Sequence, residues 1–347
     1  MRMSLRLMRV PVLIESNRKG TEKMSKSTSI YCALLLVLPM RLHGASLTPI
    51  PDTGFSFQAI SGKPMPVWNG GAFLVVDAFS SSNPVINVLN MHGAQIGSVS
   101  ITIPESKLTA VRCVARGDDG TIVAGGWTSS VDGRTASILA VVSPDGAVSI
   151  SRTDPFQANQ LTFAQDGSIW AQGFIGRNPE RIVDADPAHG IIRHFDRAGK
   201  MTGSFLPEAK LNNRLREMRG YLAVAAGRVG WISWVESAYG GIVAGGYVEI
   251  ATDGSLRELP LPVMVDIRGF TITNTGIPMA DVVTERPNSG HPQRSGMMSL
   301  NRETATWEAV DMPGSTSMTG KTLIGGSGGT LAILDVGAKT VSFLAAN

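Results

Sequence analysis

The 347 residues are 43% hydrophobic but only 17% charged and include 39 glycines, a combination that favours a β-rich protein of short strands and tight turns. The net charge of +3 is concentrated at the start, because residues 1–45 hold eight Lys and Arg against two Glu, a charge of +6, which leaves −3 for residues 46–347. Such a mildly acidic body lacks the basic surface of nucleic-acid-binding proteins, so we expect no nucleic-acid partner.

Residues 1–45 are predicted to be an N-terminal extension that ends in a signal peptide. Downstream of Met24, a plausible true start, Lys26 supplies a positive charge, residues 30–40 form an apolar run, and Gly44 and Ala45 are small. This layout predicts cleavage near Gly44–Ala45 and a secreted or periplasmic protein with no membrane span in the mature chain. The apolar run is short for a transmembrane helix, although an uncleaved anchor stays open as the alternative.

Residues 46–347 are predicted to form a single domain that repeats a strand–turn–strand phrase. Each copy places a glycine at a hairpin turn, where the positive φ costs glycine little. Asp-Gly at 119–120, 145–146, 166–167 and 253–254 is a strong hairpin signal. Six copies occur, at 67–79, 112–127, 161–174, 222–235, 270–283 and 317–326, with turn glycines expected at Gly71, Gly120, Gly167, Gly230, Gly276 and Gly320.

A second hairpin follows each copy, which gives four strands per unit. Repeats of about 40–50 residues with four short strands are typical of propeller blades. We therefore predict an all-β fold, a β-propeller of six blades with four antiparallel strands each. A seven-bladed ring is the alternative, and it would place another unit in the wide interval between Gly167 and Gly230 or join residues 46–65 to the C-terminus. Ring closure is also open: the last unit is complete in itself, or residues 55–60 add a strand to it.

With these units in place, the chain resembles the broad group of six-bladed propellers that includes TolB-like, NHL-repeat and SMP-30/gluconolactonase proteins. The lactonases of this group hold a divalent metal with a glutamate, an asparagine and an aspartate. Asn159 in QANQLTFAQDGSIW resembles their asparagine, but Pro64 stands where the glutamate should be, and MRGYLAVAAGRVGW (218–231) has no aspartate before its strand. We therefore expect no metal site and no cofactor.

The face opposite the tight turns is predicted to carry the binding residues, because long loops on a rigid scaffold concentrate them. Long connections are expected at 127–136, 174–190, 235–246 and 284–296, and a short helix over 206–220. Arginines on these loops predict an anion- or polysaccharide-binding lip, aromatic residues predict stacking on a ring, and carboxylates predict acid–base chemistry. The candidates are Trp127, Arg134, Asn159, Arg177, Arg181, Glu236, Tyr239, Glu285 and Arg286. The alternative for the arginines is simple solvation beside acidic neighbours, and for the aromatic residues it is anchoring of a loop.

The sequence shows no complete catalytic constellation. Cys113 lies in the apolar stretch AVRCVA, which indicates a buried structural thiol, and GGSGG (325–329) indicates a connection between strands. Single acidic residues such as Asp77 and Asp281 lie near the ends of strands and could supply an acid and a base. We expect a monomeric binding or interaction module for an unknown protein, glycan or small molecule. The alternative is a hydrolase or lyase that acts on a carbohydrate or lactone in the funnel.

Overall fold

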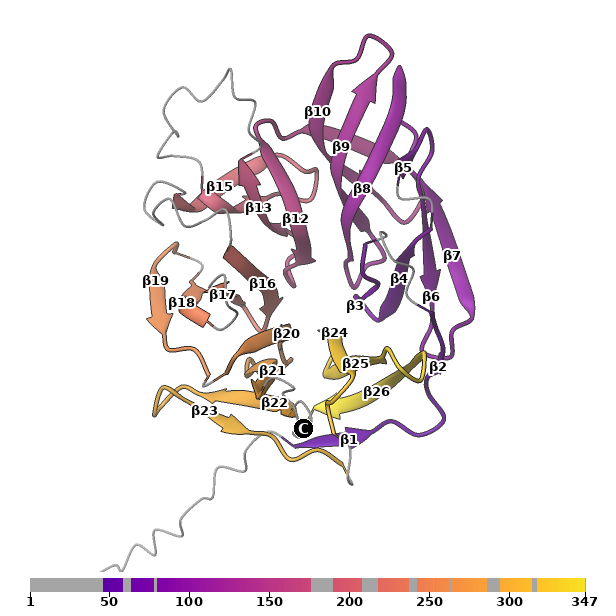
Figure 1. The fold of residues 1–347 in the computed structure, drawn as a ribbon. Helices are drawn as coiled ribbons and strands as arrows, with labels where there is room; N and C mark the ends of the chain where they lie inside the picture. The colour runs from indigo at the N-terminus through magenta and orange to yellow at the C-terminus, as the bar shows by residue number, and fades with distance from the viewer. Residues whose placement is uncertain are drawn as a thin grey trace, which may run out of the picture. The chain divides into compact units, whose positions relative to one another are not determined.

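The structure is a computed structural model. It describes residues 46–58, 64–77, 80–175, 190–207, 218–236, 242–251, 253–262, 264–285, 294–313 and 317–346. Every regular element in these ranges is a β-strand, and the strands form six sheets arranged as a ring (Figure 1). No helix in these ranges has the length and apolar character needed to cross a membrane. The all-β prediction and the six-bladed propeller are confirmed.

Each blade has four antiparallel strands, ordered outward from the centre of the ring, and in blade 2 the two-residue strand β5 (Ser80–Ser81) also pairs with the inner strand β8. The blades are as follows: blade 1, β3 (Val67–Asn69), β4 (Ala72–Val76), β6 (Val85–Leu89) and β7 (Gln95–Ser100); blade 2, β8 (Ser106–Arg116), β9 (Ile122–Ser130), β10 (Thr135–Val142) and β11 (Val148–Arg152); blade 3, β12 (Phe156–Phe163), β13 (Ile169–Ile175), β14 (Gly190–Phe195) and β15 (Met201–Pro207); blade 4, β16 (Met218–Ala225), β17 (Arg228–Glu236), β18 (Ile242–Ile250) and β19 (Leu256–Leu259); blade 5, β20 (Asp266–Ile272), β21 (Pro278–Glu285), β22 (Arg294–Asn301) and β23 (Thr306–Ala309); blade 6, β24 (Lys321–Ser327), β25 (Thr330–Asp335), β26 (Thr340–Ala346) and β1 (Leu47–Pro49).

The N-terminal segment of the domain closes the ring. β1 pairs with β26, Leu47 opposite Ala346, and β2 (Phe55–Ser56) pairs farther along the same strand, Phe55 opposite Val341. Leu47 is buried in the core of blade 6. The outer edge of the last blade therefore comes from the N-terminal end of the domain. Residues 55–56 of the predicted range 55–60 pair there, and β1 (Leu47–Pro49) adds the outer strand that the sequence analysis did not predict. The described residues form no seventh blade.

The turn that was predicted from Asp-Gly recurs with one hydrogen-bond pattern. At Ala164–Ser168 the Ala164 N–H donates to the Ser168 carbonyl, the Gly167 N–H donates to the Ala164 carbonyl, and the Asp166 carboxylate accepts the Ser168 N–H. Gly167 has φ +81°, which explains why a residue without Cβ is needed there. The same backbone pattern occurs at the turns that contain Gly93, Gly120, Gly133, Gly146, Gly199, Gly254 and Gly276.

Three predicted connections were wrong in detail. Gly230 lies inside β17, and the turn of blade 4 is Ala226–Gly227. Gly320 precedes β24, so that the turn of blade 6 is Gly328–Gly329 within the GGSGG stretch. The expected long loop at 127–136 is a tight hairpin between β9 and β10. Most of the expected helix over 206–220 lies outside the described residues, and its ends belong to β15 and β16.

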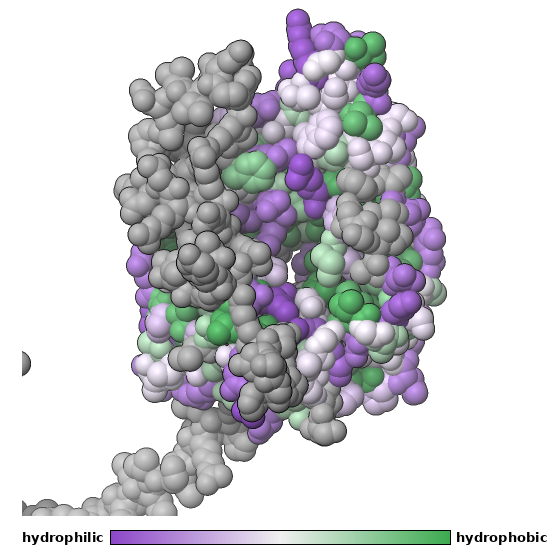
Figure 2. All heavy atoms as spheres, in the orientation of Figure 1, coloured by the Kyte–Doolittle hydropathy of each residue, from purple (hydrophilic) through white to green (hydrophobic). Residues whose placement is uncertain are grey.

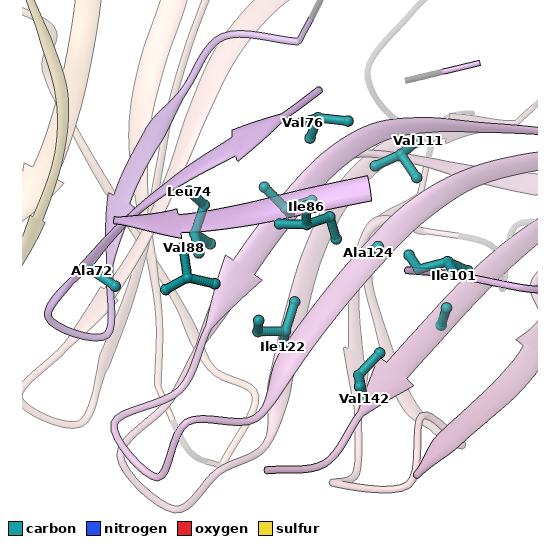
Figure 3. Packing of buried hydrophobic residues seen from close by; sticks show 12 residues of the cluster. Ala72, Leu74, Val76, Ile86, Val88, Ile101, Val111, Ile122, Ala124 and Val142 are labelled. Atoms are coloured by element: carbon teal, nitrogen blue, oxygen red, sulfur yellow. The ribbon is translucent and has the colours of Figure 1, made fainter. Parts of the chain in front are cut away.

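The blades are held together by apolar contacts between neighbouring sheets. Figure 3 shows one such cluster, in which Leu74 and Ile86 of blade 1 pack with Ile122 and Ala124 of blade 2. The alternate residue Val123 joins the next cluster, with Leu161 of blade 3. A sheet with both faces covered explains why these strands read as continuous apolar runs.

The inner strands contact one another in sequence around the ring. Their approach is close enough to require glycine: a Cβ on Gly269 of β20 would lie 2.3 Å from the carbonyl oxygen of Leu323 on β24. Cys113 is buried beside Gly125, and burial raises the pKa of its thiol to about 12, which fits the predicted structural thiol. The ring centre is thus built from backbone packing as much as from side chains.

Candidate functional site

We call the two ends of the ring the turn face, where each inner strand ends, and the loop face, where each second strand ends. Blade 2 reaches farthest toward the loop face, since β8 has 11 residues and β9 has nine. Large apolar side chains are exposed at this end: Met65 by 55%, Val131 by 79%, Phe174 by 40% and Val336 by 58%. As many are exposed at the starts of outer strands on the turn face, Ile96, Val148, Met201 and Leu256, so exposed apolar side chains do not distinguish the two ends.

The structure places the predicted site residues on several blades. Trp127 is half-buried in β9, and Arg134 is exposed at the hairpin tip, where it pairs with Asp132 at 3.2 Å. Glu285 ends β21 in blade 5 and pairs with exposed Arg294 at 3.4 Å. Glu236 ends β17, but its side chain lies outside the description, as do residues Arg177, Arg181, Tyr239 and Arg286. Arg134 and Glu285 are therefore not brought together, because two blades lie between blades 2 and 5 in either direction around the ring.

Asn159 is the predicted residue that lies nearest the ring axis. It is the extra residue of a β-bulge in inner strand β12, between Ala158 and Gln160, and it is exposed although both neighbours in the ladder are paired. A bulge turns a side chain out of the regular alternation. Because β13 covers one edge of β12, an exposed side chain at mid-strand can reach solvent only on the other side, toward the centre of the ring. Figure 2 shows an opening there, bordered in part by hydrophilic residues.

Two arginines that the sequence analysis missed occupy the same place in other blades. Arg112 lies at a bulge between Val111 and Cys113 in β8, and Arg268 lies at one between Ile267 and Gly269 in β20. Each stands eight residues before its turn glycine, since 120 − 112, 167 − 159 and 276 − 268 all equal 8. Because these turns share one geometry, Arg112, Asn159 and Arg268 lie at one level of the channel. We call these three the channel residues.

The two channel arginines differ in their partners. Arg112 is exposed between buried neighbours, and no described carboxylate lies within 4.0 Å of it. Arg268 is 18% exposed; its Nη2 donates to Asp281 at 3.1 Å and to the Met318 carbonyl at 2.8 Å, while its buried Nε has no acceptor. Blades 2 and 5 stand opposite each other in a six-bladed ring, but the bonds to Asp281 and to the Met318 carbonyl hold the Arg268 guanidinium between blades 5 and 6, so that Arg112 is the arginine of the two that is left free.

The candidate acid Asp281 is fully buried in β21, which argues against a role in general acid–base catalysis. Besides Arg268, it accepts the Leu323 N–H of blade 6 at 3.3 Å. Burial raises the pKa of Asp281 to about 6, and the nearby Arg268 only partly opposes this. Asp281 thus links blade 5 to blade 6. A comparable link joins blades 3 and 4, where the Gln160 amide bonds the backbone of Gly220 and Leu222.

Groups of three or more His, Cys, Asp or Glu that could hold a metal ion do not occur within the described ranges. The exposed channel residues instead offer hydrogen-bond donors, the guanidinium of Arg112 and the primary amide of Asn159. Such a set recognises oxyanions, because guanidinium and amide N–H groups match carboxylate, sulfate and phosphate oxygens.

No protein-family model matches this sequence, and no curated protein matches it. Solved structures that are similar include TolB from Acinetobacter baumannii (11% identity, TM-score 0.42, 79% of this chain and 63% of that one), YjhT (10%, 0.46, 86% and 95%) and the Dos1 propeller (11%, 0.42, 84% and 82%). This chain therefore spans less than two thirds of TolB. The six-bladed propeller itself is defined by the strand pairing of this chain.

Proposed function

We propose that this chain is an exported β-propeller that acts as a binding module and holds an anionic ligand in its central channel. Export is supported by the signal-like leader in residues 1–45. The observation that carries the binding proposal is Arg112, an exposed cation without a described carboxylate partner, at one level with Asn159 of the neighbouring blade.

Arg112 differs from the other central arginine, Arg268, in having no described acidic partner, and the two residues that flank it are buried. A cation in a channel with low-dielectric walls attracts oxyanions more strongly than one on an open surface. Asn159 adds neutral donors on the neighbouring blade.

The proposal is tested by titrating the protein with three oligosaccharides of equal length, one carboxylated, one sulfated and one neutral. We expect the acidic oligomers to bind and the neutral one not to bind. Arg112→Gln should weaken binding of the acidic oligomers about tenfold or more, because a charged hydrogen bond is lost. Asn159→Ala should weaken it less, and raising salt from about 50 to 200 mM should weaken it in the wild type.

Arg152→Gln is the matched control, because it removes the same charge from the exposed outer strand β11 of the same blade. If Arg112→Gln and Arg152→Gln weaken binding equally, the attraction is a property of the whole surface, and the channel site is wrong. If the oligomers are cleaved during the titration, as mass spectrometry would detect, the protein is an enzyme of the funnel, and the binding-module proposal is overturned.

A further inference from the structure

A buried arginine lies away from the channel, in the seam between blades 2 and 3. Arg193 belongs to β14, the third strand of blade 3, and only 3% of it is exposed. It forms no ion pair with any carboxylate in the described ranges, and its Nε and Nη2 are buried without an acceptor. Burial lowers the pKa of Arg193 to about 10, so the side chain remains a cation at neutral pH. A buried cation without a counter-ion is strongly disfavoured.

The surroundings of Arg193 fix which edge of the guanidinium is free. Its central carbon lies 4.2 Å from the centroid of the Phe156 ring, so one flat face is covered by a cation–π contact. Phe156 reaches it by crossing the second strand at Gly173, where a Cβ would lie 2.6 Å from the ring. The two unpartnered nitrogens, Nε and Nη2, share one edge of the guanidinium. That edge carries two parallel N–H groups, the arrangement that pairs side-on with both oxygens of a carboxylate.

The seam also brings an aromatic side chain to the same level. Gly125 of β9 packs against Ala158 of β12, where a Cβ on Gly125 would lie 2.9 Å from that of Ala158. Two residues farther toward the loop face, β9 carries Trp127 and β12 carries Phe156, both about 6–7 Å beyond this contact. Trp127 therefore stands on blade 2 opposite the Phe156–Arg193 stack. It is half-buried, and Phe156 is the first residue of its strand, so the seam lies next to the loop face.

The polar groups nearest in the chain are already satisfied by other partners. The Thr153 hydroxyl donates to the Phe156 carbonyl at 2.9 Å, and the Asp154 carboxylate accepts the Ser137 N–H at 2.8 Å. Both groups keep acceptor capacity, but neither lies within hydrogen-bond distance of the unpartnered Nε and Nη2 of Arg193.

From this geometry we infer that the seam between blades 2 and 3 is a binding site for a ring-bearing carboxylate. Arg193 pairs side-on with the carboxylate, and Trp127 contacts the sugar or aromatic ring that carries it. The site is separate from the channel residues, since Arg193 lies on the third strand of its blade and Asn159 lies on the first. It therefore stands or falls independently of the proposed function.

The inference is tested with four small probes by calorimetry and thermal unfolding: glucuronate, benzoate, acetate and glucose. We expect glucuronate or benzoate to bind and to raise the unfolding temperature, and the better of the two identifies the ring. Acetate lacks the ring and glucose lacks the charge, so both should bind at least about tenfold more weakly. Trp127→Ala should remove the advantage of the ring-bearing acid over acetate.

Arg193→Met should abolish carboxylate binding while leaving the unliganded protein as stable as the wild type or more so, because it replaces an unpaired buried charge by an apolar chain of similar length. Arg193→Lys keeps the charge but lacks the two parallel N–H groups, so its affinity for the carboxylate should fall about tenfold. This variant provides the test if Arg193→Met does not fold. Arg152→Gln, which removes a charge from the exposed outer strand β11, should leave the affinity for the carboxylate unchanged.

Three results would overturn the inference. The first is that none of the four probes binds at millimolar concentration. The second is that acetate and chloride stabilise the protein as much as the ring-bearing acids, which would be a non-specific ion effect. The third is that Arg193→Lys binds the carboxylate as tightly as the wild type. In each case the free edge of Arg193 is satisfied by buried water or by the chain itself.

Discussion

The buried carboxylate of Asp281 makes the stability of this propeller depend on pH in an unusual direction. Its pKa rises from 3.8 in the unfolded chain to about 6 in the fold, where burial outweighs Arg268. The folded state thus holds an additional proton between pH of about 4 and 6. The contribution of Asp281 to stability is complete below about pH 4 and is lost as pH rises through 6. At 1.36 kcal/mol per tenfold change in proton affinity, it amounts to about 2–3 kcal/mol between pH 4 and pH 7.

The effect is measured by comparing wild type with Asp281→Asn in urea unfolding at several pH values between 4 and 7. Asparagine keeps the shape and an acceptor for the Leu323 N–H but cannot titrate. It leaves Arg268 without a counter-ion at pH 7, where Asp281 is ionised in the wild type, whereas near pH 4 Asp281 is protonated in the wild type as well. The difference between the two proteins should therefore change with pH, with the wild type gaining about 2–3 kcal/mol relative to the variant as pH falls from 7 to 4.

Only the difference between the two proteins isolates this residue. Hydrogen bonds from nearby Thr and Ser lower the pKa of Asp119, Asp166 and Asp253 in the glycine turns, and these groups make the fold less stable as pH falls. They act equally in both proteins and cancel on subtraction. A flat difference for Asp281→Asn, or one that grows toward pH 7, would refute the assignment.

Two further changes test the architecture. Gly269→Ala should lower the free energy of unfolding by about 3 kcal/mol, because the new Cβ would meet the Leu323 backbone. The control Gly296→Ala has no atom within 4 Å of the new Cβ and should change the free energy of unfolding by less than about 0.5 kcal/mol. Equal effects of the two changes in urea unfolding would contradict the close approach of the inner strands. Leu47→Ala should cost about 2–5 kcal/mol if β1 closes the ring, while the same change at exposed Ile96 should cost little, and a stable Leu47→Ala protein would show that the closing strand is dispensable.

The fold could be predicted from the sequence because its repeated turns are chemically explicit. A turn whose fourth residue has positive φ selects glycine, and the preceding Asp caps it, as at Asp166–Gly167. The turn predicted at Gly230 in blade 4 is wrong because the actual turn begins with Ala226, at φ +50°. Alanine rarely adopts a positive φ, so this residue gives no turn signal in the sequence.

The miss in blade 6 came from a second use of glycine. The stretch TLIGG resembles TIVAGG, which belongs to β9, the second strand of its blade, but TLIGG lies in the inner strand β24. Gly325 is needed in β24 because a Cβ there would lie 2.3 Å from the Trp68 carbonyl oxygen of blade 1. Sequence alone does not distinguish a glycine required by a turn from one required by contact with another blade, since the contact depends on the closed ring.

The candidate site was harder to predict because a bulge reverses the usual meaning of the pattern. In AVRCVA, regular alternation would turn Arg112 into the face opposite Val111 and Cys113, which is also covered by a neighbouring blade, and a charge there would be an error. The register shift between Val111 and Cys113 removes Arg112 from the alternation and directs it to the channel. A charged or amide residue at the centre of an otherwise apolar inner strand, at a constant distance from the turn glycine, is therefore itself the signal. The distance of eight residues to the turn glycine is the same for Arg112, Asn159 and Arg268, and it can be read from this sequence without a related protein for comparison.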